Sequence, residues 1–405
     1  MGSQVNTPST SRSGASFGFR PRALTPAASA HLDLIRALAA WCVMWGHARA
    51  FAFVAYQQLG HASPVVRAIY FFTGFGHQAV MVFFVLSGFL ISSAILTRTA
   101  AGNWSWRDYA IDRSSRLYVV LIPGLLLGFL WDKAGSSLFA ASGIYAQVLE
   151  GFGLAIARNQ LTFGNFVGNL FFLQTILCSV FGSNAPLWSL SNEFWYYVLF
   201  PVALAAAIAW KRKSVRLAAP LTILAICIAV FVGRAIMIGF LTWLVGTALV
   251  LAYSNWRVSR KGWLALYLGI SSLALFACVT VARLSYPTWL GSDTVVGFMF
   301  GVFLFGALQI DFGTEGGKYA RTAHFLSGFS YSLYVLHFPF LLFLRAWLVP
   351  AQKWQPDVRH LAYGIVLGAV ALGFAWFVSI FTENKTRVVR RWMRKTIPAL
   401  DSRSG

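Results

Sequence analysis

The chain has 405 residues, of which 58% are hydrophobic and only 11% are charged, and it contains 16 Trp and 36 Phe. This composition excludes an ordinary soluble domain and indicates an integral membrane protein. The formal net charge of +21 would suit a protein that binds nucleic acid. The basic residues are instead distributed as in a membrane protein, so we predict no nucleic-acid partner.

Apolar runs of about 20 residues, the length that crosses a bilayer, recur along the chain and predict an all-α polytopic membrane domain over residues 31–382. Residues 1–30 are rich in Ser, Thr, Pro and Gly and lack the apolar core of a signal peptide, so we predict a disordered cytoplasmic tail. Residues 383–405 are predicted to be a basic cytoplasmic tail. The ten predicted transmembrane helices cover residues 32–56, 69–96, 115–131, 188–210, 217–233, 236–253, 263–282, 291–310, 325–347 and 361–381.

The basic residues orient these helices. Of the 33 Lys and Arg residues, 23 fall in the tails and loops of one side, 7 in the loops of the other side and 3 within the spans. Cytoplasmic loops carry the excess of Lys and Arg in membrane proteins. We therefore predict that both termini are cytoplasmic.

Three shorter features accompany the spans. The stretch Phe163–Phe181 is apolar, but a crossing there would move the basic cluster 211–216 to the outer side, so we predict a re-entrant or interfacial segment. Trp104–Asp112 is predicted to be a short amphipathic helix on the cytoplasmic surface. The cysteines show no metal-ligand or disulfide spacing and are interpreted as packing residues; they are Cys42, Cys178, Cys227 and Cys278.

The first span carries ionisable side chains on one stripe. Arg36 and His47 differ by only about 20° around the helix after whole turns and lie roughly 16 Å apart along it. Asp33 is on the same side, can pair with Arg36, and is more consistent with an orienting partner than with a catalyst. Ionisable groups are costly in hydrocarbon, so this stripe predicts a functional site. Arg49 faces away from His47 near the outer end and is predicted to extend to the membrane interface.

Two later spans bring polar groups to a similar depth. Glu193 follows Trp188 and Ser189 in an aromatic run whose rings suit an interfacial belt, but a carboxylate there predicts an orienting role toward a base or an acceptor hydroxyl. In the ninth span, the spacing i, i+4 and i+7 places three polar side chains on one face, either for hydrogen bonds between helices or for the site. They are Ser330, Tyr334 and His337.

Arg113 and Arg116 stand three residues apart at the cytoplasmic end of the third span. Such a pair either anchors the helix at the inner surface or binds phosphate groups, and two guanidinium groups on one face favour phosphate. The pair Ser87-Gly88 in the second span is a small notch that indicates close helix packing rather than a site for an acyl chain.

These motifs together resemble the acyltransferase 3 family of membrane O-acyltransferases, which modify surface polysaccharides, Nod factors and macrolides. The resemblance lies in the Arg-x10-His pattern from Arg36 to His47 and in four further motifs in family order. These are Phe83–Ile91, Arg113–Tyr118, Trp188–Tyr197 and Ser330–Pro339.

The resemblance implies an integral protein of the bacterial inner membrane that transfers an acyl group, most simply acetyl, from cytoplasmic acyl-CoA to a hydroxyl of a cell-surface glycan or glycolipid. It implies no bound cofactor or metal. In this mechanism Arg36, Arg113 and Arg116 hold the coenzyme phosphates. His47 acts as general base and Glu193 orients His47 or the acceptor. The residues leave open the acyl group, the acceptor, and direct transfer against an acyl-enzyme.

Two other classes of protein fit the buried charges. A transporter or flippase for a polysaccharide precursor or small solute would use them to line a permeation path. A structural or sensor membrane protein would use them only as polar contacts between helices.

Overall fold

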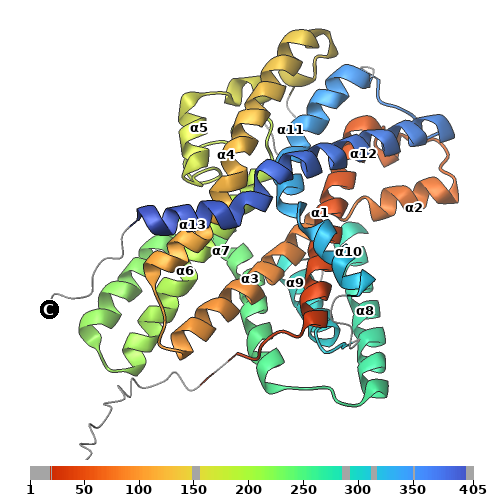
Figure 1. Ribbon diagram of the computed structural model, residues 1–405. Helices are drawn as coiled ribbons and strands as arrows, with labels where there is room; N and C mark the ends of the chain where they lie inside the picture. The colour runs from red at the N-terminus through yellow and green to blue at the C-terminus, as the bar shows by residue number, and fades with distance from the viewer. Residues whose placement is uncertain are drawn as a thin grey trace, which may run out of the picture.

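The computed structural model describes residues 19, 21–147, 156–284, 292–311, 317–349 and 352–397, and within these ranges it is built of α-helices with short 3-10 turns and no named strand (Figure 1). Eight helical segments are long and apolar enough to cross a membrane. The prediction of an all-α polytopic membrane protein is therefore confirmed. The segments are Pro26–Ala52, Pro64–Ala100, Trp106–Leu138, Leu187–Lys211, Val215–Asn255, Lys261–Leu284, Ser330–Leu348 and Val358–Thr396.

The ten predicted spans correspond to these segments and to one shorter helix. The fifth and sixth spans are the two halves of one long helix, which Gly233 interrupts with a φ of 79°. The eighth span is a helix of 15 residues, which is short for a bilayer. The helices are α1 (Pro26–Ala52), α2 (Pro64–Phe72), α3 (Gly76–Ala100), α4 (Trp106–Leu138), α5 (Phe163–Leu170), α6 (Leu187–Lys211), α7 (Val215–Asn255), α8 (Lys261–Leu284), α9 (Asp293–Ala307), α10 (Lys318–Ser327), α11 (Ser330–Leu348), α12 (Val358–Phe381) and α13 (Thr386–Thr396).

Several predicted boundaries are wrong. The predicted surface helix Trp104–Asp112 and the third span are one continuous helix, α4, whose start is capped by Ser105 accepting from the Asp108 amide. The predicted N-terminal tail ends earlier than residue 30, because Thr25 and Pro26 provide an N-cap and a first-turn proline for α1. Residues 1–18 and 20 of that tail lie outside the described residues. The predicted basic C-terminal tail contains α13.

The stretch Phe163–Phe181 contains the short helix α5 and then irregular backbone. Buried amides satisfy that backbone: Asn169 donates to the Ser179 carbonyl at 2.9 Å and accepts from the Phe181 amide at 3.1 Å. Gln174 donates to the Leu187 carbonyl at 2.9 Å. Irregular backbone inside a membrane protein requires such partners. The re-entrant placement of this segment stays a prediction.

The helices form two groups that meet at α1 and α3. In one group α11 packs against α1, α4 and α12, while α13 packs on α4. In the other group α7 packs against α3, α6 and α9, and α8 packs on α9 (Figure 1). Polar side chains from α1, α3, α4, α6 and α11 converge where the two groups of helices meet. The packing of the bundle therefore positions the site.

The backbones of α3 and α7 are in direct contact. A Cβ atom at Gly88 would lie 1.9 Å from the Trp243 carbonyl oxygen, and one at Gly246 would lie 2.2 Å from the Val85 carbonyl oxygen. Only glycine allows this approach, which is typical of small residues between membrane helices. The predicted packing role of the Ser87-Gly88 notch is confirmed for Gly88, whereas Ser87 lines a cavity.

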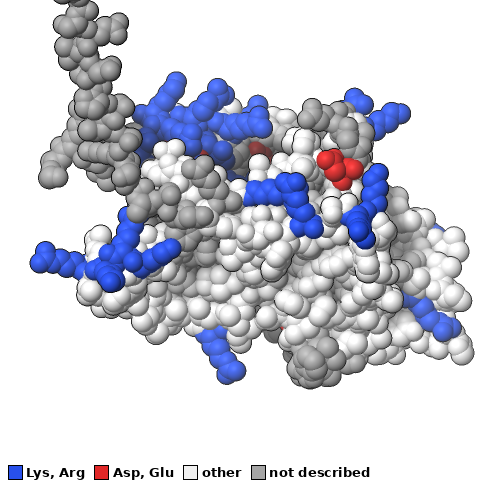
Figure 2. Space-filling model, turned by 90° about the horizontal axis from the view of Figure 1, so that it is seen from below, with Lys and Arg blue, Asp and Glu red and all other residues white. Residues whose placement is uncertain are grey.

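Charge is unevenly distributed over the surface. In Figure 2 most Lys and Arg side chains lie in the upper part of the molecule and at its left edge, and few lie along the lower edge. This arrangement is consistent with the positive-inside rule. The cytoplasmic placement of the termini stays a prediction.

We expect Gly246→Ala to destabilise the protein, because its Cβ meets rigid backbone of α3. Overpacking of this kind costs about 1–3 kcal/mol. The measurement is the thermal unfolding midpoint of the purified protein in detergent. Gly269→Ala, at a position where an added Cβ meets nothing within 4 Å, is the matched control and should leave the midpoint unchanged. Equal midpoints for the two variants would contradict the close α3–α7 contact.

Candidate active site

The first of two cavities on the line between the helix groups is lined by arginines. It has a volume of about 310 Å³ and is bounded by α1, α3, α4, α6, α11 and α13. We call it the arginine cavity. Its charged lining residues are Arg36, Arg113, Arg116, Arg390 and Glu193.

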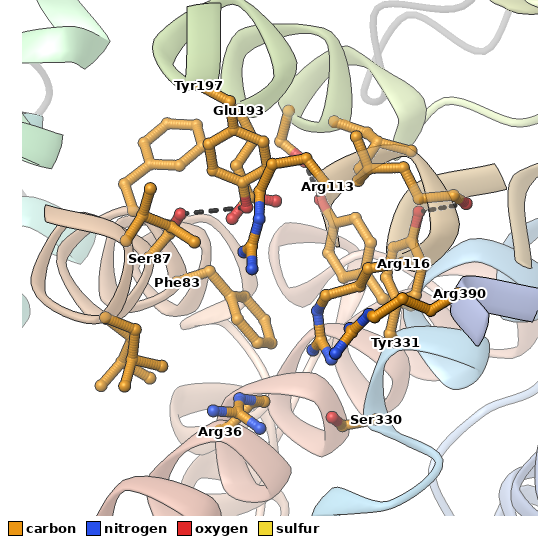
Figure 3. A pocket seen from close by; sticks show the side chains of 18 residues that line it. Arg36, Phe83, Ser87, Arg113, Arg116, Glu193, Tyr197, Ser330, Tyr331 and Arg390 are labelled. Atoms are coloured by element: carbon orange, nitrogen blue, oxygen red, sulfur yellow. Dashed lines mark hydrogen bonds between the residues drawn. The ribbon is translucent and has the colours of Figure 1, made fainter. Parts of the chain in front are cut away.

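The three arginines predicted to bind acyl-CoA are brought together here. Arg113 and Arg116 lie one turn apart on α4, and Arg36 reaches the cavity from α1 while donating to Asp33 at 3.3 Å (Figure 3). The Nε atom of Arg113 is buried without a hydrogen-bond partner among the described residues. Arg36 and Arg390 pair with Asp33 and Asp112, whereas Arg113 and Arg116 form no salt bridge in the described part of the chain. The positive charge of these two guanidinium groups suits a phosphorylated ligand.

The fourth arginine was missed by sequence analysis. Arg390 comes from α13, within the predicted basic tail, and Figure 3 shows its guanidinium group beside that of Arg116. A buried carboxylate and a second arginine fasten α13 to α4. Asp112 bonds Arg394 at 2.8 Å and Arg390 at 3.3 Å, as well as Arg98 of α3 at 2.8 Å. Arg107 donates to the Arg394 carbonyl at 2.7 Å. No local pattern links positions so far apart in the sequence, so only the packing of α13 on α4 identifies Arg390.

Glu193 lies in the arginine cavity among further polar groups that sequence analysis did not select. Ser87 donates to the Tyr197 hydroxyl at 3.2 Å, and the Trp243 indole donates to Ser87 at 3.1 Å. Tyr331 also lines this cavity. Such satisfied buried networks fix the side chains that line a site.

The second cavity, of about 930 Å³, contains His47. We call it the histidine cavity. It is lined by the end of α1, the α2–α3 connection, the start of α6 and the loop that leads into α12. Trp188 lies here, with its ring centroid 6.1 Å from that of His77.

His47 and His337 form a pair whose proton positions follow from their contacts. His47 Nδ1 lies 2.8 Å from His337 Nε2, and His337 Nδ1 lies 2.8 Å from the Leu333 carbonyl oxygen. A carbonyl only accepts, so the neutral His337 carries its proton on Nδ1 and accepts at Nε2. His47 therefore donates from Nδ1 and has its lone pair on Nε2. The contact with His337 thus fixes the tautomer of His47.

Tyr334 separates the two cavities and lines both of them. Its hydroxyl lies 2.5 Å from Ser189 Oγ and donates to the Pro186 carbonyl at 3.2 Å. Ser189 lines the arginine cavity, one turn of α6 from Glu193. These contacts join α11 to the start of α6 at the wall between the cavities.

The remaining predicted residues divide between the cavities. Glu193 was predicted to orient His47 or the acceptor, but it lines the arginine cavity, and the contact that orients His47 comes from His337. Ser330 lines the arginine cavity and donates to the Ser327 carbonyl at 2.8 Å. Arg49, predicted to extend to the membrane interface, lines the histidine cavity instead.

A family model described as an acyltransferase domain matches residues 29–380. The chain belongs to the acyltransferase 3 family. It is a membrane acyltransferase, as the resemblance implied.

The curated relatives include the "Putative peptidoglycan O-acetyltransferase YrhL" of Bacillus subtilis (strain 168), which is 29% identical over 168 residues. The match covers 39% of this chain and 24% of the relative, so this acyltransferase spans about a quarter of that relative's length. No solved structure matches the chain.

We expect Asp112→Asn to loosen α13, because hydrogen bonds to charged groups contribute about 1.5–3 kcal/mol each and this carboxylate holds three arginines. Hydrogen exchange of residues 386–397 should become faster while exchange in α1 and α3 stays unchanged. Asp293→Asn, which breaks a distant ion pair with His77, is the control and should not affect α13. Unaltered exchange of α13 in Asp112→Asn would show that other contacts hold it.

Proposed function

We propose that this acyltransferase moves an acetyl group from acetyl-CoA, bound in the arginine cavity, to a hydroxyl of a cell-surface glycan or glycolipid in the histidine cavity. The observation that carries the proposal is the juxtaposition of the two cavities across Tyr334. One cavity offers cations for a phosphorylated donor, and the other offers a base for a hydroxyl.

The positive charge of the arginine cavity supports a phosphorylated donor. Coenzyme A carries three phosphate groups, and guanidinium groups bind phosphate through paired hydrogen bonds. Arg113 has a buried Nε atom that a phosphate oxygen would satisfy. The adjacent guanidinium groups of Arg116 and Arg390 add two further forks (Figure 3). The thioester end of the donor would pass Tyr334 to reach His47, which lies about 16 Å along α1 from Arg36.

The chemical step is a single acyl transfer. His47 Nε2 removes the proton of the acceptor hydroxyl as the oxygen attacks the thioester carbonyl carbon. The carbon–sulfur bond then breaks, and the leaving thiolate takes the proton from the His47 imidazolium. His337 keeps His47 in the required tautomer throughout. Tyr334, with its hydroxyl at the wall between the cavities, lies where the thioester must pass.

The size of the histidine cavity and the name of the relative support a glycan acceptor. A cavity of about 930 Å³ is large enough for a saccharide unit. The name of the Bacillus relative specifies peptidoglycan, which is a surface glycan, and supports an acceptor of that class. The uneven distribution of Lys and Arg supports a donor that binds from the cytoplasm and an acceptor on the outer side of a bacterial inner membrane (Figure 2).

The decisive experiment uses proteoliposomes supplied with acetyl-CoA labelled in the acetyl group. A labelled ester on an added glycan, released by mild base, supports transfer. Movement of an unmodified solute across the bilayer without any labelled ester would support the transporter instead.

We expect His47→Ala to lower acetyl transfer by about 10²–10⁴-fold, the contribution typical of a general base. Binding of acetyl-CoA should be retained, because the donor phosphates lie in the other cavity. His61→Ala, at an exposed loop position, is the matched control and should keep full activity. Full activity of His47→Ala would show that His47 is not the general base.

We expect Arg390→Gln to raise the KM for acetyl-CoA about tenfold, as expected for loss of one charge-assisted contact of about 1.5 kcal/mol. The kcat should change little, because Arg390 lies far from the reacting carbonyl. Arg391→Gln removes the same charge from the exposed neighbouring position and should leave both constants unchanged. Equal KM values for the two variants would show that Arg390 does not bind the donor.

A further inference from the structure

The histidine cavity contains a cluster of cations that the acyl-transfer chemistry does not use. Arg49, Arg283 and Lys353 line it, and no carboxylate is found among its described lining residues. They come from the last turn of α1, the last turn of α8 and the loop before α12. The predicted outer face has few cations, so three that converge from separate segments on one cavity indicate a local purpose.

Each of the three cations is held by a neighbouring element. Lys353 donates to the Ala50 carbonyl at 2.7 Å, and its loop is hydrogen-bonded to the end of α1 through Trp354, whose amide donates to the Ala52 carbonyl at 3.0 Å. The guanidinium carbon of Arg49 lies 4.8 Å from the Tyr70 ring centroid. The Tyr70 hydroxyl in turn donates to the Val54 carbonyl at 2.8 Å.

Arg283 crosses a glycine to reach the cavity. A Cβ atom at Gly74 would lie 2.2 Å from Arg283 Nε, so any larger residue there would displace the guanidinium group. Within the described part of the chain, none of the three cations forms a salt bridge. They are therefore positioned side chains with unused positive charge.

The cations also repel one another. Burial, together with the charges of Arg345 and Arg49, lowers the pKa of Lys353 below its usual value. A bound anion would reverse this repulsion and form charge-assisted hydrogen bonds with all three groups. His47 opens into the same cavity, so the anion and the reacting hydroxyl would belong to one ligand.

We propose that the acceptor carries an oxyanion, a carboxylate or a phosphate, which Arg49, Arg283 and Lys353 bind while His47 deprotonates a nearby hydroxyl. This inference rests on the proposed function and narrows its acceptor to anionic glycans or glycolipids. Neutral glycans of the same size would lack the partner that this cavity offers.

The test uses the full-length protein in neutral detergent and two matched pairs of probes. One pair is a muramic-acid-containing disaccharide and its carboxamide. The other is a disaccharide phosphodiester and its methyl triester. Within each pair the negative charge is removed with little change in size, and comparison of the pairs distinguishes a carboxylate from a phosphate. Calorimetry measures binding, and acetyl transfer from labelled acetyl-CoA measures KM and kcat for each probe.

We expect an anionic probe to bind at least tenfold more tightly than its neutral partner. Arg49→Gln, Arg283→Gln and Lys353→Gln should each raise its KM about tenfold, with kcat changed less than about threefold. Each estimate corresponds to the loss of one charge-assisted hydrogen bond. Arg359→Gln removes a cation from the first turn of α12 that contacts Tyr363 of the same helix. This variant is the control and should behave as wild type.

The inference is overturned when neither pair shows a preference for the anion, or when the preference survives all three substitutions. It is also overturned when these variants weaken coenzyme A binding, since the cluster would then belong to the donor. A clear anionic preference without any acetyl transfer would instead count against the proposed function and leave the anion site in place. The binding and transfer measurements therefore separate the two failures.

Discussion

Charge buried in a membrane bundle must be paired or must face a polar cavity, and the arrangement of this acyltransferase follows from that constraint. At one mouth the single carboxylate of Asp112 pairs with arginines of α3 and α13, which fastens the C-terminal helix to α4. Arg113 and Arg116, which form no salt bridge within the described ranges, face the arginine cavity. The proposed phosphorylated donor would offset their charge.

The two cavities also keep the arginines of the proposed donor site away from the imidazole. A donor with several phosphates needs clustered cations, whereas an imidazole that must accept a proton is weakened by cations that no anion offsets. Tyr334 and Ser189 lie between these environments, and His337 supplies the contact that orients His47. The separation explains why the motif places an arginine and a histidine eleven residues apart on one stripe of α1 rather than side by side.

Features set by local periodicity could be predicted from the sequence. The common face of Arg36 and His47 follows from helix geometry, and so does the face of α11 that carries Tyr334 and His337. Features set by contacts between distant segments could not be predicted. Depth arithmetic placed Glu193 at the level of His47, but depth is one coordinate only. The rotation of α6 and the wall formed by Tyr334 place Glu193 in the other cavity.

The predicted boundaries of some helices were wrong for a related reason. A charged, amphipathic start to α4 reads as a separate surface helix, yet the capped helix continues into the bilayer because its polar face meets α13. The composition of the basic C-terminal segment is typical of a solvated tail, and the sequence does not show that Asp112 lies opposite it. In both cases a partner far away in the sequence turns exposed charge into packed charge.

The cations of the histidine cavity link binding of the proposed acceptor to activation of its hydroxyl. In the proposed mechanism an imidazolium forms when His47 takes the hydroxyl proton, in a cavity that already holds Arg49, Arg283 and Lys353. Without an anion, this fourth positive charge would oppose proton transfer. An oxyanion on the acceptor would offset part of this charge and stabilise the imidazolium at the moment it forms. The correct acceptor would thereby complete the base, so selection of the substrate and activation of its hydroxyl would arise from the same charge.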